Sequence, residues 1–354
     1  MKRLEKLRNY LKSINCESAL LTSFPSIFYY SGFTSEDAYL YITQNEQYIV
    51  TDTRYTIQTK IESPAFTLVD GYSSVYEFIK PLAEKENIKS VAFEDLHHTV
   101  SAYNLLKEST TFSEYYPLKT KITQLRRKKD LDEIKKISNA LKVAENALEN
   151  TIPYIKAGTT ELEITAILEG NMRKLGAEKT SFSTICASGV RGALPHGTAS
   201  QKAVENGEMI TLDFGCIFEG YCSDITRTFS VGTPTDKQKE IYNTVLAAQL
   251  EAEKLLKSGL SCKDADFAAR SVIEKSGYGK NFGHSLGHGV GIEIHELPNL
   301  SPRSETVLAA GDVVTVEPGI YVESFGGVRI EDMVVIGDDK IEILTEFTKE
   351  LLIL

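Results

Sequence analysis

Two hydrophobic periods alternate along the first 120 residues of the chain. Apolar side chains between Leu4 and Leu11 recur at the helical spacing, whereas four later runs are apolar or β-prone throughout. These runs cover residues 18–22, 39–43, 47–51 and 90–93. The second and third runs flank the short turn Gln44-Asn45-Glu46, which predicts a β-hairpin. The whole pattern predicts a small α/β domain.

The composition changes between Lys119 and Asp130, where charged residues dominate. Immediately afterwards, apolar side chains recur at helical spacing from Leu131 to Leu148 and predict a long helix. A chain of 354 residues is long enough for two domains, each with its own core. We therefore place the boundary near residue 125 and expect domains at residues 1–125 and 126–354.

Another helix is predicted to begin at Thr160, because Thr160 and Glu163 have the spacing of a capping box. Its buried stripe would contain Ile164, Ile167 and Leu168. From residue 181 onward the chain is rich in β-prone runs separated by glycines, which is typical of strands. The sequence therefore predicts a two-domain protein of the α/β (α+β) class.

Composition narrows the classes of protein to which the chain can belong. Hydrophobic residues make up 42% and charged residues 25%, which is typical of a globular protein and excludes disorder, collagen and coiled coil. The formal net charge of −10 disfavours binding to nucleic acid or to an anionic membrane surface. The one dense basic patch, residues 126–129, is followed by interleaved acids and is interpreted as a solvated linker or helix start.

No targeting or membrane segment is predicted. The N-terminus begins with basic residues but lacks the apolar stretch of a signal peptide. No segment approaches the roughly 18 apolar residues that a membrane span needs. The five cysteines are scattered and form no CxxC pair, so they predict neither a disulfide framework nor a zinc knuckle. We therefore expect a cytoplasmic protein with buried or incidental thiols.

Candidate catalytic residues concentrate in the C-terminal half. Four of the six histidines lie there: His196, His284, His288 and His295. A β-prone run with Asp213 and another with Asp224 lie on either side of a turn predicted near residues 218–220. The two aspartates are equidistant from a turn centre between residues 218 and 219, so their carboxylates are predicted to face each other across an antiparallel pair.

A second predicted hairpin repeats this arrangement. Glu317 and Glu331 lie at equal distances from a turn centred at Ser324. Facing carboxylates repel each other unless a cation lies between them or one is protonated. His288 lies between the two hairpins in a glycine-rich segment, residues 283–291, where the backbone can approach a shared centre closely.

Four carboxylates and one imidazole, without a thiolate, make a ligand set that suits two divalent cations such as Mn, Co, Fe or Zn. The ligands would be Asp213, Asp224, His288, Glu317 and Glu331. Their four negative charges balance two dipositive ions, and a bridging hydroxide would add one more negative charge. Arg329 lies two residues before Glu331 on the same strand face and could offset that charge.

The order and type of these five residues resemble the Xaa-Pro peptidases, aminopeptidase P and prolidase. Two further motifs carry the resemblance: Ser188-Gly-Val-Arg-Gly-Ala-Leu-Pro-His196-Gly and Gly287-His288-Gly-Val-Gly-Ile-Glu-Ile-His295-Glu. The resemblance implies a dinuclear metallopeptidase of the pita-bread fold from about residue 130 to the end, related to methionine aminopeptidase and creatinase. Residues 1–125 resemble the creatinase-type N-terminal domain, notably around Phe28-Tyr-Tyr-Ser-Gly-Phe and Thr51-Asp-Thr-Arg-Tyr.

The resemblance also implies a role for each residue. Asp213 would bind one metal, and Asp224 and Glu331 would bridge both. His288 and Glu317 would complete the second metal. The remaining histidines, His196, His284 and His295, would contact substrate or hydrogen-bond around the site. A hydroxide bridging the metals would attack the Xaa-Pro bond, with Glu317 as a proton shuttle. The implied metal is Mn²⁺, with Co²⁺, Zn²⁺ or Fe²⁺ as alternatives.

The alternatives to a metallopeptidase are a serine hydrolase and a non-catalytic binding protein of the same fold. Residues 283–287, Gly-His-Ser-Leu-Gly, match the G-x-S-x-G elbow of serine hydrolases. The last histidine, His295, follows Ser285 by only ten residues, and Glu293 is the only acid between them, so we interpret the match as a coincidence. A non-catalytic binding protein of the same fold would need a broken ligand set, and none of the five positions is broken here.

The resemblance leaves aminopeptidase and dipeptidase open. Prolidases tend to carry an arginine a few residues after the His-Glu of the third motif, where it can bind the C-terminal carboxylate of a dipeptide. Here His295-Glu-Leu-Pro298 is followed by Asn299, and the next arginine is Arg303. This departure favours an aminopeptidase P-like enzyme, and the N-terminal domain disfavours methionine aminopeptidase. The implied partners are proline-containing peptides or dipeptides and a second copy of the chain in a homodimer.

Overall fold

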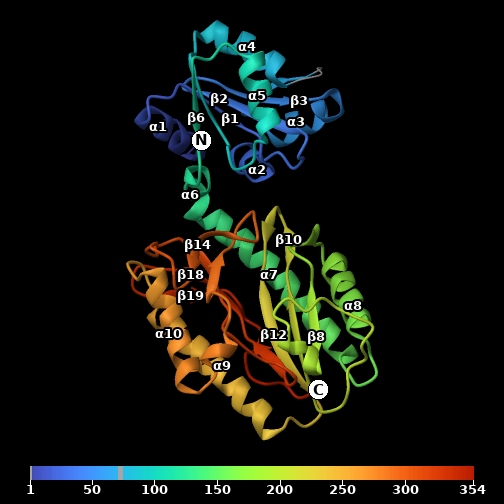
Figure 1. The fold of residues 1–354 in the computed structure, drawn as a ribbon. Helices are drawn as coiled ribbons and strands as arrows, with labels where there is room; N and C mark the ends of the chain where they lie inside the picture. The colour runs from blue at the N-terminus through green and yellow to red at the C-terminus, as the bar shows by residue number, and fades with distance from the viewer. Residues whose placement is uncertain (1, 71–74) are drawn as a thin grey trace. The chain divides into compact units, whose positions relative to one another are not determined.

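The computed structural model describes residues 2–70 and 75–354. The chain divides into two compact units, Met1–Arg126 and Arg127–Leu354. Helices and strands alternate through the first unit, whereas the second unit has long helices on the outside of curved strands (Figure 1). Each unit has a hydrophobic core of its own.

A six-stranded mixed sheet forms the first unit, with the strand order β4-β3-β2-β1-β5-β6. Its strands are β1 (Ser18–Leu21), β2 (Ala38–Thr43), β3 (Gln47–Thr51), β4 (Thr67–Val69), β5 (Ser90–Phe93) and β6 (Glu114–Pro117). Strand β1 pairs antiparallel with β2 and parallel with β5, and β2 and β3 form a hairpin in which Ile42 pairs with Gln47. The predicted runs and the predicted hairpin are thus confirmed.

Six α-helices lie within residues 2–70 and 75–127, and the last of them, α6, ends at the first residue of the second unit. They are α1 (Lys2–Ser13), α2 (Phe24–Ser31), α3 (Thr56–Glu62), α4 (Val75–Glu86), α5 (Val100–Ser109) and α6 (Lys121–Arg127), with a short 3-10 helix at Thr53–Tyr55. Helix α1 buries Leu4, Leu7 and Leu11, which lie on one face at helical spacing. The helix predicted from these positions is therefore confirmed.

Four small sheets form the strand layer of the second unit. Their orders are β11-β10-β7, β12-β9-β8, β14-β13-β15-β18-β19 and β16-β17. The strands up to β12 are β7 (Lys179–Thr180), β8 (Ile185–Ser188), β9 (Glu208–Phe214), β10 (Cys216–Phe218), β11 (Tyr221–Cys222) and β12 (Ile225–Val231). The later strands are β13 (Gly287–Gly289), β14 (Glu296–Leu300), β15 (Val313–Val316), β16 (Gly319–Val322), β17 (Gly326–Arg329), β18 (Asp332–Ile336) and β19 (Ile341–Ile343).

Four long helices flank these strands: α7 (Leu131–Thr151), α8 (Glu161–Lys174), α9 (Asp236–Leu255) and α10 (Cys262–Lys275). Short 3-10 helices lie at Ile152–Tyr154, Gly189–Ala193 and Gly279–Asn281. Helices α7 and α8 pack together near β8 and β10, and α9 and α10 pack together near β14 and β17 (Figure 1). The strands, and any site on them, are thus enclosed between two helix pairs.

Both helices predicted in this unit form, and side-chain caps explain where they begin. The side chains of Thr160 and Glu163 cap α8 reciprocally, as predicted. Ile164 and Leu168 of the predicted stripe are fully buried, and Ile167 is half-buried. Helix α7 begins at the predicted residue and carries an equivalent box between Asp130 and Glu133.

The first carboxylate-bearing hairpin, β9 to β12, has a register that differs from the predicted one. A two-residue turn, Glu219-Gly220, joins β10 and β11, and both residues have positive φ. Turns of this type need the left-handed conformation at both central positions, which Gly220 adopts without strain. The turn centre therefore lies one residue later than predicted. Asp213 pairs with Thr226, and the prediction that it faces Asp224 is wrong.

The second hairpin, β15 to β18, has the predicted register. Val316 pairs with Asp332 and Gly319 pairs with Arg329, so the turn is centred at Ser324. Ser324 has a φ of 61°. The ladder is interrupted between these two pairs, and the two glutamates of the predicted site lie at the interruption.

All five cysteines are buried and free, as predicted. None of the helices within residues 2–70 and 75–354 combines the length and the apolar character that a membrane span requires.

Candidate metal centre

A cavity of about 620 Å³ lies within the second unit. The side chains predicted from the sequence line it together: His196, Asp213, Asp224, His284, His288, His295, Glu317, Arg329 and Glu331. Four apolar residues also line it: Phe182, Ile185, Pro195 and Ile294. The fold thus gathers predicted site residues that are up to 135 positions apart, from His196 to Glu331, around one space.

Three carboxylates form the centre of the cavity wall. Asp213 lies in β9, Asp224 lies between β11 and β12, and Glu331 lies between β17 and β18. Each offers one oxygen, and these oxygens all lie within 4.8 Å of one another. The two aspartates therefore converge although they are not register partners.

The two oxygens of Asp213 have different surroundings. Oδ2 accepts a hydrogen bond from Nη2 of Arg329 at 2.5 Å. Oδ1 is buried and has no partner among the residues that the structure describes. A buried carboxylate oxygen without a partner is costly, and a cation would satisfy it. Oδ1 of Asp213 could therefore accept a cation while Arg329 fixes the other oxygen.

His288 presents a lone pair to the same space. Its Nδ1 lies 3.0 Å from the carbonyl oxygen of Gly289, which can only accept, so Nδ1 carries the proton. Nε2 is left as an acceptor, 3.6 Å from Oδ2 of Asp224 and 3.4 Å from Oε1 of Glu317. Burial lowers the pKa of His288 to about 4, so the ring is neutral at pH 7. A neutral imidazole with a free Nε2 lone pair suits metal ligation.

The carboxylates are under electrostatic strain without a cation. Burial, followed by the neighbouring carboxylates, raises the pKa of Asp224 and of Glu331 well above the ordinary range. Burial and Asp213 raise the pKa of Glu317 to about 8. Divalent cations would neutralise these charges and restore ionisation. The residues present therefore fit divalent metal ions.

Two threonines orient the glutamates, and the sequence analysis did not single them out. Thr226 donates a hydrogen bond from its hydroxyl to Oε2 of Glu331 at 2.7 Å. Thr315 donates to Oε1 of Glu317 at 3.0 Å, and its own hydroxyl accepts from the backbone N–H of His288. Thr315 lies two residues before Glu317 on one strand face, so the strand periodicity could have indicated it.

Tyr321 is a third residue that the sequence analysis missed. Its hydroxyl accepts a hydrogen bond from Nη1 of Arg329 at 2.7 Å and lies 2.9 Å from Nε2 of His284. Nδ1 of His284 lies 2.8 Å from the carbonyl oxygen of Ser285, so Nε2 accepts the phenol proton. His284 is thus engaged with Tyr321 and supports the site through hydrogen bonds.

Gly319 makes room for the Tyr321 ring. A Cβ atom on Gly319 would lie 2.5 Å from the phenol oxygen of Tyr321 and 2.7 Å from its Cζ. Because Gly319 and Tyr321 lie on the same face of β16 and Gly319 pairs with Arg329, the ring can lie over the glycine and reach the guanidinium. The same-face spacing of glycine, tyrosine and arginine is the signal from which the contact could have been predicted.

His196 and His295 are the exposed imidazoles of the cavity. The His295 ring lies 4.4 Å from the His288 ring, edge to face. Neither His196 nor His295 hydrogen-bonds through its ring to another residue in the part of the chain that the structure describes. Both rings are therefore available to a bound molecule.

The local structure excludes the serine-hydrolase alternative. A nucleophile elbow requires a strand, a sharp turn at the serine and then a helix. Ser285 instead follows the 3-10 helix Gly279–Asn281 and precedes strand β13. The match of residues 283–287 to the elbow motif is therefore a coincidence, as predicted.

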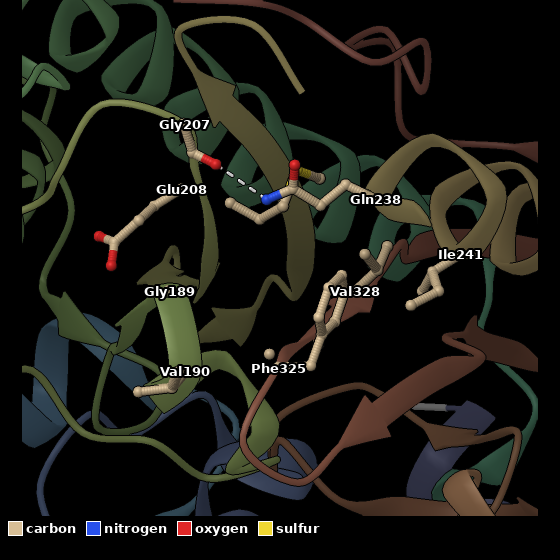
Figure 2. A pocket seen from close by; sticks show the side chains of 11 residues that line it. Gly189, Val190, Gly207, Glu208, Gln238, Ile241, Phe325 and Val328 are labelled. Atoms are coloured by element: carbon tan, nitrogen blue, oxygen red, sulfur yellow. Dashed lines mark hydrogen bonds between the residues drawn. The ribbon is translucent and has the colours of Figure 1, made fainter. Parts of the chain in front are cut away.

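A second hollow, of about 180 Å³, lies on the other face of β17 (Figure 2). Val328 lines it, whereas the next residue, Arg329, lines the main cavity. Gln238 closes part of it by donating to the carbonyl of Gly207 at 2.9 Å (Figure 2). None of the predicted site residues lines this hollow, so the candidate chemistry belongs to the main cavity alone.

Comparison with known proteins identifies the family. The model of metallopeptidase family M24 matches residues 135–338, and that of the creatinase/prolidase N-terminal domain matches residues 3–128. A solved Xaa-Pro dipeptidase from Bacillus anthracis has a TM-score of 0.97 and 42% identity over 100% of this chain and 99% of that one. A solved X-Pro aminopeptidase from Thermotoga maritima has a TM-score of 0.94 and 40% identity over 99% and 100%.

A sequence relative supports the same assignment. The Xaa-Pro dipeptidase of Pyrococcus horikoshii is 37% identical over 360 residues, which cover 99% of this chain and 98% of the relative. The predictions of the fold class and of a metallopeptidase are confirmed. Divalent metal ions follow from the family and agree with the carboxylate cluster. The chain belongs to metallopeptidase family M24 and combines a creatinase/prolidase N-terminal domain with a pita-bread metallopeptidase domain.

Proposed function

We propose that the protein is an Xaa-Pro aminopeptidase, which removes the residue that precedes proline at the N-terminus of a peptide. One observation carries the proposal: the oxygens of Asp213, Asp224 and Glu331 converge within 4.8 Å beside the free Nε2 of His288. Relatives of 37–42% identity are named Xaa-Pro dipeptidases and an X-Pro aminopeptidase, which supports this substrate class. We also propose residues 1–125 and 126–354 as the two domains.

The proposed centre holds two divalent ions. Asp213, Asp224 and Glu331 would hold the ions through their carboxylates, and His288 and Glu317 would complete the ligand set. Five ligands with four carboxylates favour Mn²⁺, and Co²⁺, Zn²⁺ or Fe²⁺ would also fit the donor types. When bound, the ions supply Lewis-acid chemistry: they lower the pKa of water and polarise the scissile carbonyl.

The chain's own residues supply the remaining steps. Glu317 is proposed to take a proton from the attacking water and to pass it to the leaving imino nitrogen. His196 and His295 are proposed to contact the substrate around the scissile bond. Arg329 and His284 act through Tyr321 and Asp213, whose positions they fix.

The apolar residues of the wall suit a prolyl ring. Phe182, Ile185, Pro195 and Ile294 line the cavity together with the carboxylates, and Ile185 pairs directly with Asp213. The carboxylates and ions would bind the free α-amine and the carbonyl of the first residue. A substrate held in this way would place its second residue, proline, against these apolar residues, and the enzyme would then act as an exopeptidase.

The choice between aminopeptidase and dipeptidase rests on the cations of the cavity. Arg329 lines the cavity, but its guanidinium already binds Asp213, Tyr321, Thr226 and the carbonyl of Pro195. Asn299, which follows His295-Glu-Leu-Pro298, lines the cavity, and Arg303 does not line it. An Xaa-Pro dipeptidase is the second candidate, because two of the relatives carry that name.

One comparison of substrates tests the proposal. The purified protein is incubated with an Xaa-Pro dipeptide, an Xaa-Pro-Yaa tripeptide and an Xaa-Ala-Yaa tripeptide, each with Mn²⁺ and with a chelator. We expect cleavage of the proline tripeptide that depends on metal and little cleavage of the other two. Cleavage of the dipeptide alone would establish the dipeptidase, and activity that resists the chelator would exclude the metal mechanism.

We further propose that the enzyme is a cytoplasmic homodimer. The five free, buried thiols are consistent with a reducing compartment. Light scattering of the purified protein tests the assembly, since a dimer has twice the mass of one chain. Fractionation of cells that produce the protein tests its location.

A further inference from the structure

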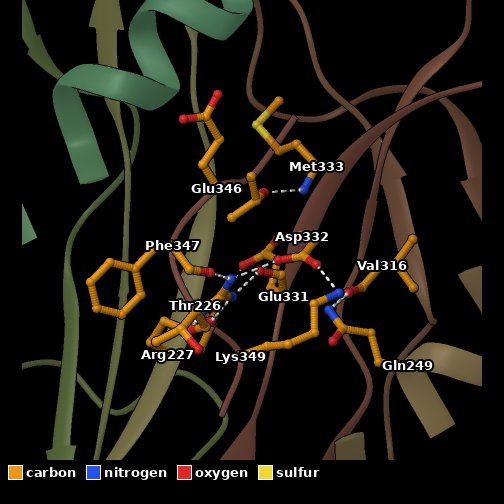
Figure 3. Close-up of polar contacts among 12 residues, drawn as sticks. Thr226, Arg227, Gln249, Val316, Glu331, Asp332, Met333, Glu346, Phe347 and Lys349 are labelled. Atoms are coloured by element: carbon orange, nitrogen blue, oxygen red, sulfur yellow. Dashed lines mark hydrogen bonds and ion pairs between the residues drawn. The ribbon is translucent and has the colours of Figure 1, made fainter. Parts of the chain in front are cut away.

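A second cluster of charged side chains lies behind the candidate metal centre. Thr226 and Arg227 are consecutive residues of β12, and Glu331 directly precedes Asp332, the first residue of β18. Neighbouring side chains on a strand point to opposite faces. The Thr226 hydroxyl and the Glu331 carboxylate hydrogen-bond on the cavity side, so Arg227 and Asp332 extend from the other side (Figure 3).

Arg227 uses all five of its donors there and is 1% exposed. Its five acceptors are the carbonyl oxygens of Thr226 at 2.9 Å, Glu331 at 2.5 Å, Phe347 at 2.7 Å and Thr348 at 2.8 Å, and Oδ1 of Asp332 at 2.8 Å. Two of these carbonyls belong to residues whose side chains face the metal centre. One guanidinium therefore holds the main chains of Thr226 and Glu331 together.

Lys349 completes the cluster from the same segment of chain. Its ammonium group pairs with Oδ2 of Asp332 (Figure 3). It also lies 3.0 Å and 3.1 Å from the two carboxylate oxygens of Glu253. Asp332 is fully buried and Glu253 nearly so. We call Arg227, Glu253, Asp332 and Lys349 the rear cluster; it brings two basic and two acidic side chains together, and burial and Asp332 raise the pKa of Glu253 to about 7.

Residues 345–354 are well anchored on this side of the unit. The backbone N–H groups of Glu346 and Phe347 each donate to Oε1 of Glu145 at 2.6 Å. Tyr242 donates to the carbonyl of Lys349 at 3.0 Å. Further along, Ser230 of β12 donates to the carbonyl of Leu352 at 3.0 Å. The segment is thus held independently of the rear cluster and can act as a fixed support.

Loss of the Lys349 charge would act on Asp332 first. Asp332 and Glu253 would then have only the positive charge of Arg227 beside them, and Glu253, whose pKa burial and Asp332 already raise to about 7, would lose the cation to which it is hydrogen-bonded. A buried charge that loses its partner is strongly destabilising, so the side chains and the attached main chain would shift to relieve it. The main chain of Asp332 continues directly into Glu331, and the shift would move the Glu331 carboxylate relative to the other ligands.

We propose that residues 347–349 are a positioning device for the metal centre. Two carbonyl groups and the Lys349 ammonium hold Arg227 and Asp332, and through them the main chains of Thr226 and Glu331, in the arrangement that binds the ions. The inference rests on the metal site of the proposed function. Its distinctive consequence is that a side chain outside the cavity controls metal affinity.

Titration of the metal-free protein with Mn²⁺ by calorimetry tests the proposal. We expect Lys349→Met to weaken Mn²⁺ binding about 10-fold or more, the range found when a hydrogen bond behind a metal ligand is lost. Lys349→Arg, which keeps the charge, should bind within a few-fold of the wild type. Lys340→Met is the matched control, because Lys340 is an exposed lysine of the same region and should bind Mn²⁺ like the wild type.

Two further variants separate positioning from general loss of stability. Met172→Ala removes a buried side chain of α8, away from both clusters, and should lower the melting temperature without weakening Mn²⁺ binding at a temperature where it is folded. The double variant Lys349→Met with Glu253→Gln restores the charge balance around Asp332 and should recover affinity relative to Lys349→Met alone. The double variant also provides the test if Lys349→Met does not fold.

The outcomes distinguish this inference from the proposed function. Wild-type affinity in Lys349→Met, or no recovery in the double variant, would overturn the positioning role while the metal site stands. Equal weakening in Met172→Ala would also overturn it, since affinity would then follow stability. A wild-type protein that binds no Mn²⁺ would overturn both.

Discussion

The two carboxylate-bearing hairpins of the second unit differ in where their ladders are interrupted. In the first hairpin, Asp213 lies inside the ladder opposite Thr226, and only Asp224 lies at the interruption. In the second, Glu317 and Glu331 both lie at the interruption, on either side of it. At an interruption of this kind the backbone makes no regular ladder pairs, and the side chains there can point in directions that differ from those in the ladder.

The carboxylates of the two hairpins also differ in the groups that fix their positions. Asp213 has its backbone fixed by pairing and one oxygen fixed by the buried Arg329. Glu317 and Glu331 are each oriented by one threonine hydroxyl. The first hairpin therefore supplies a proposed ligand fixed by a buried cation, and the second supplies two proposed ligands whose backbone N–H groups bond to Leu286 and Thr226 and whose carboxylates are oriented by hydroxyl groups. The comparison predicts that loss of a second-hairpin ligand has the largest effect.

Glu331→Gln should abolish metal binding and activity. The Glu331 oxygen lies within 4.8 Å of oxygens of both aspartates, so its charge contributes to any ion at that point. We expect no more than traces of bound metal by mass spectrometry and a fall in kcat/KM of about 10³-fold or more, since the ions supply several kcal/mol of transition-state stabilisation.

The matched control is Glu342→Gln, which removes an exposed glutamate of β19. It should keep wild-type metal content and activity. Retention of two metals per chain in Glu331→Gln would place the ligand set elsewhere and would remove the distinction between the hairpins.

Removal of the metals should reverse the dependence of stability on pH. The pKa of Glu317 is raised from an ordinary value near 4.5 to about 8 by burial and by Asp213. A carboxyl group whose pKa rises on folding contributes stability that is present below its ordinary pKa and lost as pH rises through the folded value. The melting temperature of the chelated protein should therefore fall between pH 5 and pH 8.

The metal-loaded protein should not show this fall, because its ligands are already ionised and metal binding strengthens as protons are released. Scanning calorimetry at several pH values, with Mn²⁺ and with chelator, measures the difference. A parallel pH dependence of the two forms would mean that these carboxylates are not the groups that the metals neutralise.

Gly319→Ala should have an intermediate effect on activity. The change lies in the second hairpin, but it should alter the contact of Arg329 with Asp213 in the first hairpin. The added methyl group would displace the Tyr321 ring from its place over Gly319, and Arg329 would lose the phenol that helps to hold it against Asp213. We expect activity to fall about 10- to 100-fold, as for other partners of metal ligands, with most of the bound metal kept. Gly170→Ala, in helix α8 with open space around it, is the control and should be nearly neutral.

These effects mark what the sequence could and could not predict. The types of the proposed ligands and the symmetric positions of Glu317 and Glu331 in the second hairpin could be predicted from the sequence, because they depend only on strand periodicity and on the position of one turn. The register of the first hairpin could not be predicted from the sequence. It depends on which two consecutive residues adopt positive φ in the turn, and a shift of the turn by one residue changes every pair in the ladder. Contacts such as Arg329 with Asp213, 116 residues apart, depend on the packing of the two hairpins, and no local pattern encodes it.

The turn of the first hairpin provides the test with the smallest expected effect. Glu219 has a φ of 50° in the turn of the first hairpin, where its exposed side chain makes no hydrogen bond to another of the described residues. Asparagine adopts this conformation with less strain, and Asn-Gly is the preferred pair in such turns. Glu219→Asn should therefore stabilise the protein by a few tenths to about 1 kcal/mol, which raises the melting temperature by up to about 4 °C at this size.

The same change should leave kcat/KM and metal content as in the wild type, because the turn lies on the far side of β10 and β11 from Asp213 and Asp224. Glu219→Pro, whose φ near −65° is incompatible with the turn, should lower the melting temperature and, by disturbing the register, the metal content as well. If Glu219→Asn lowered the melting temperature, the two-residue turn would be wrong. The pairing of Asp213 with Thr226, on which the contrast between the hairpins depends, would then have to be reassigned.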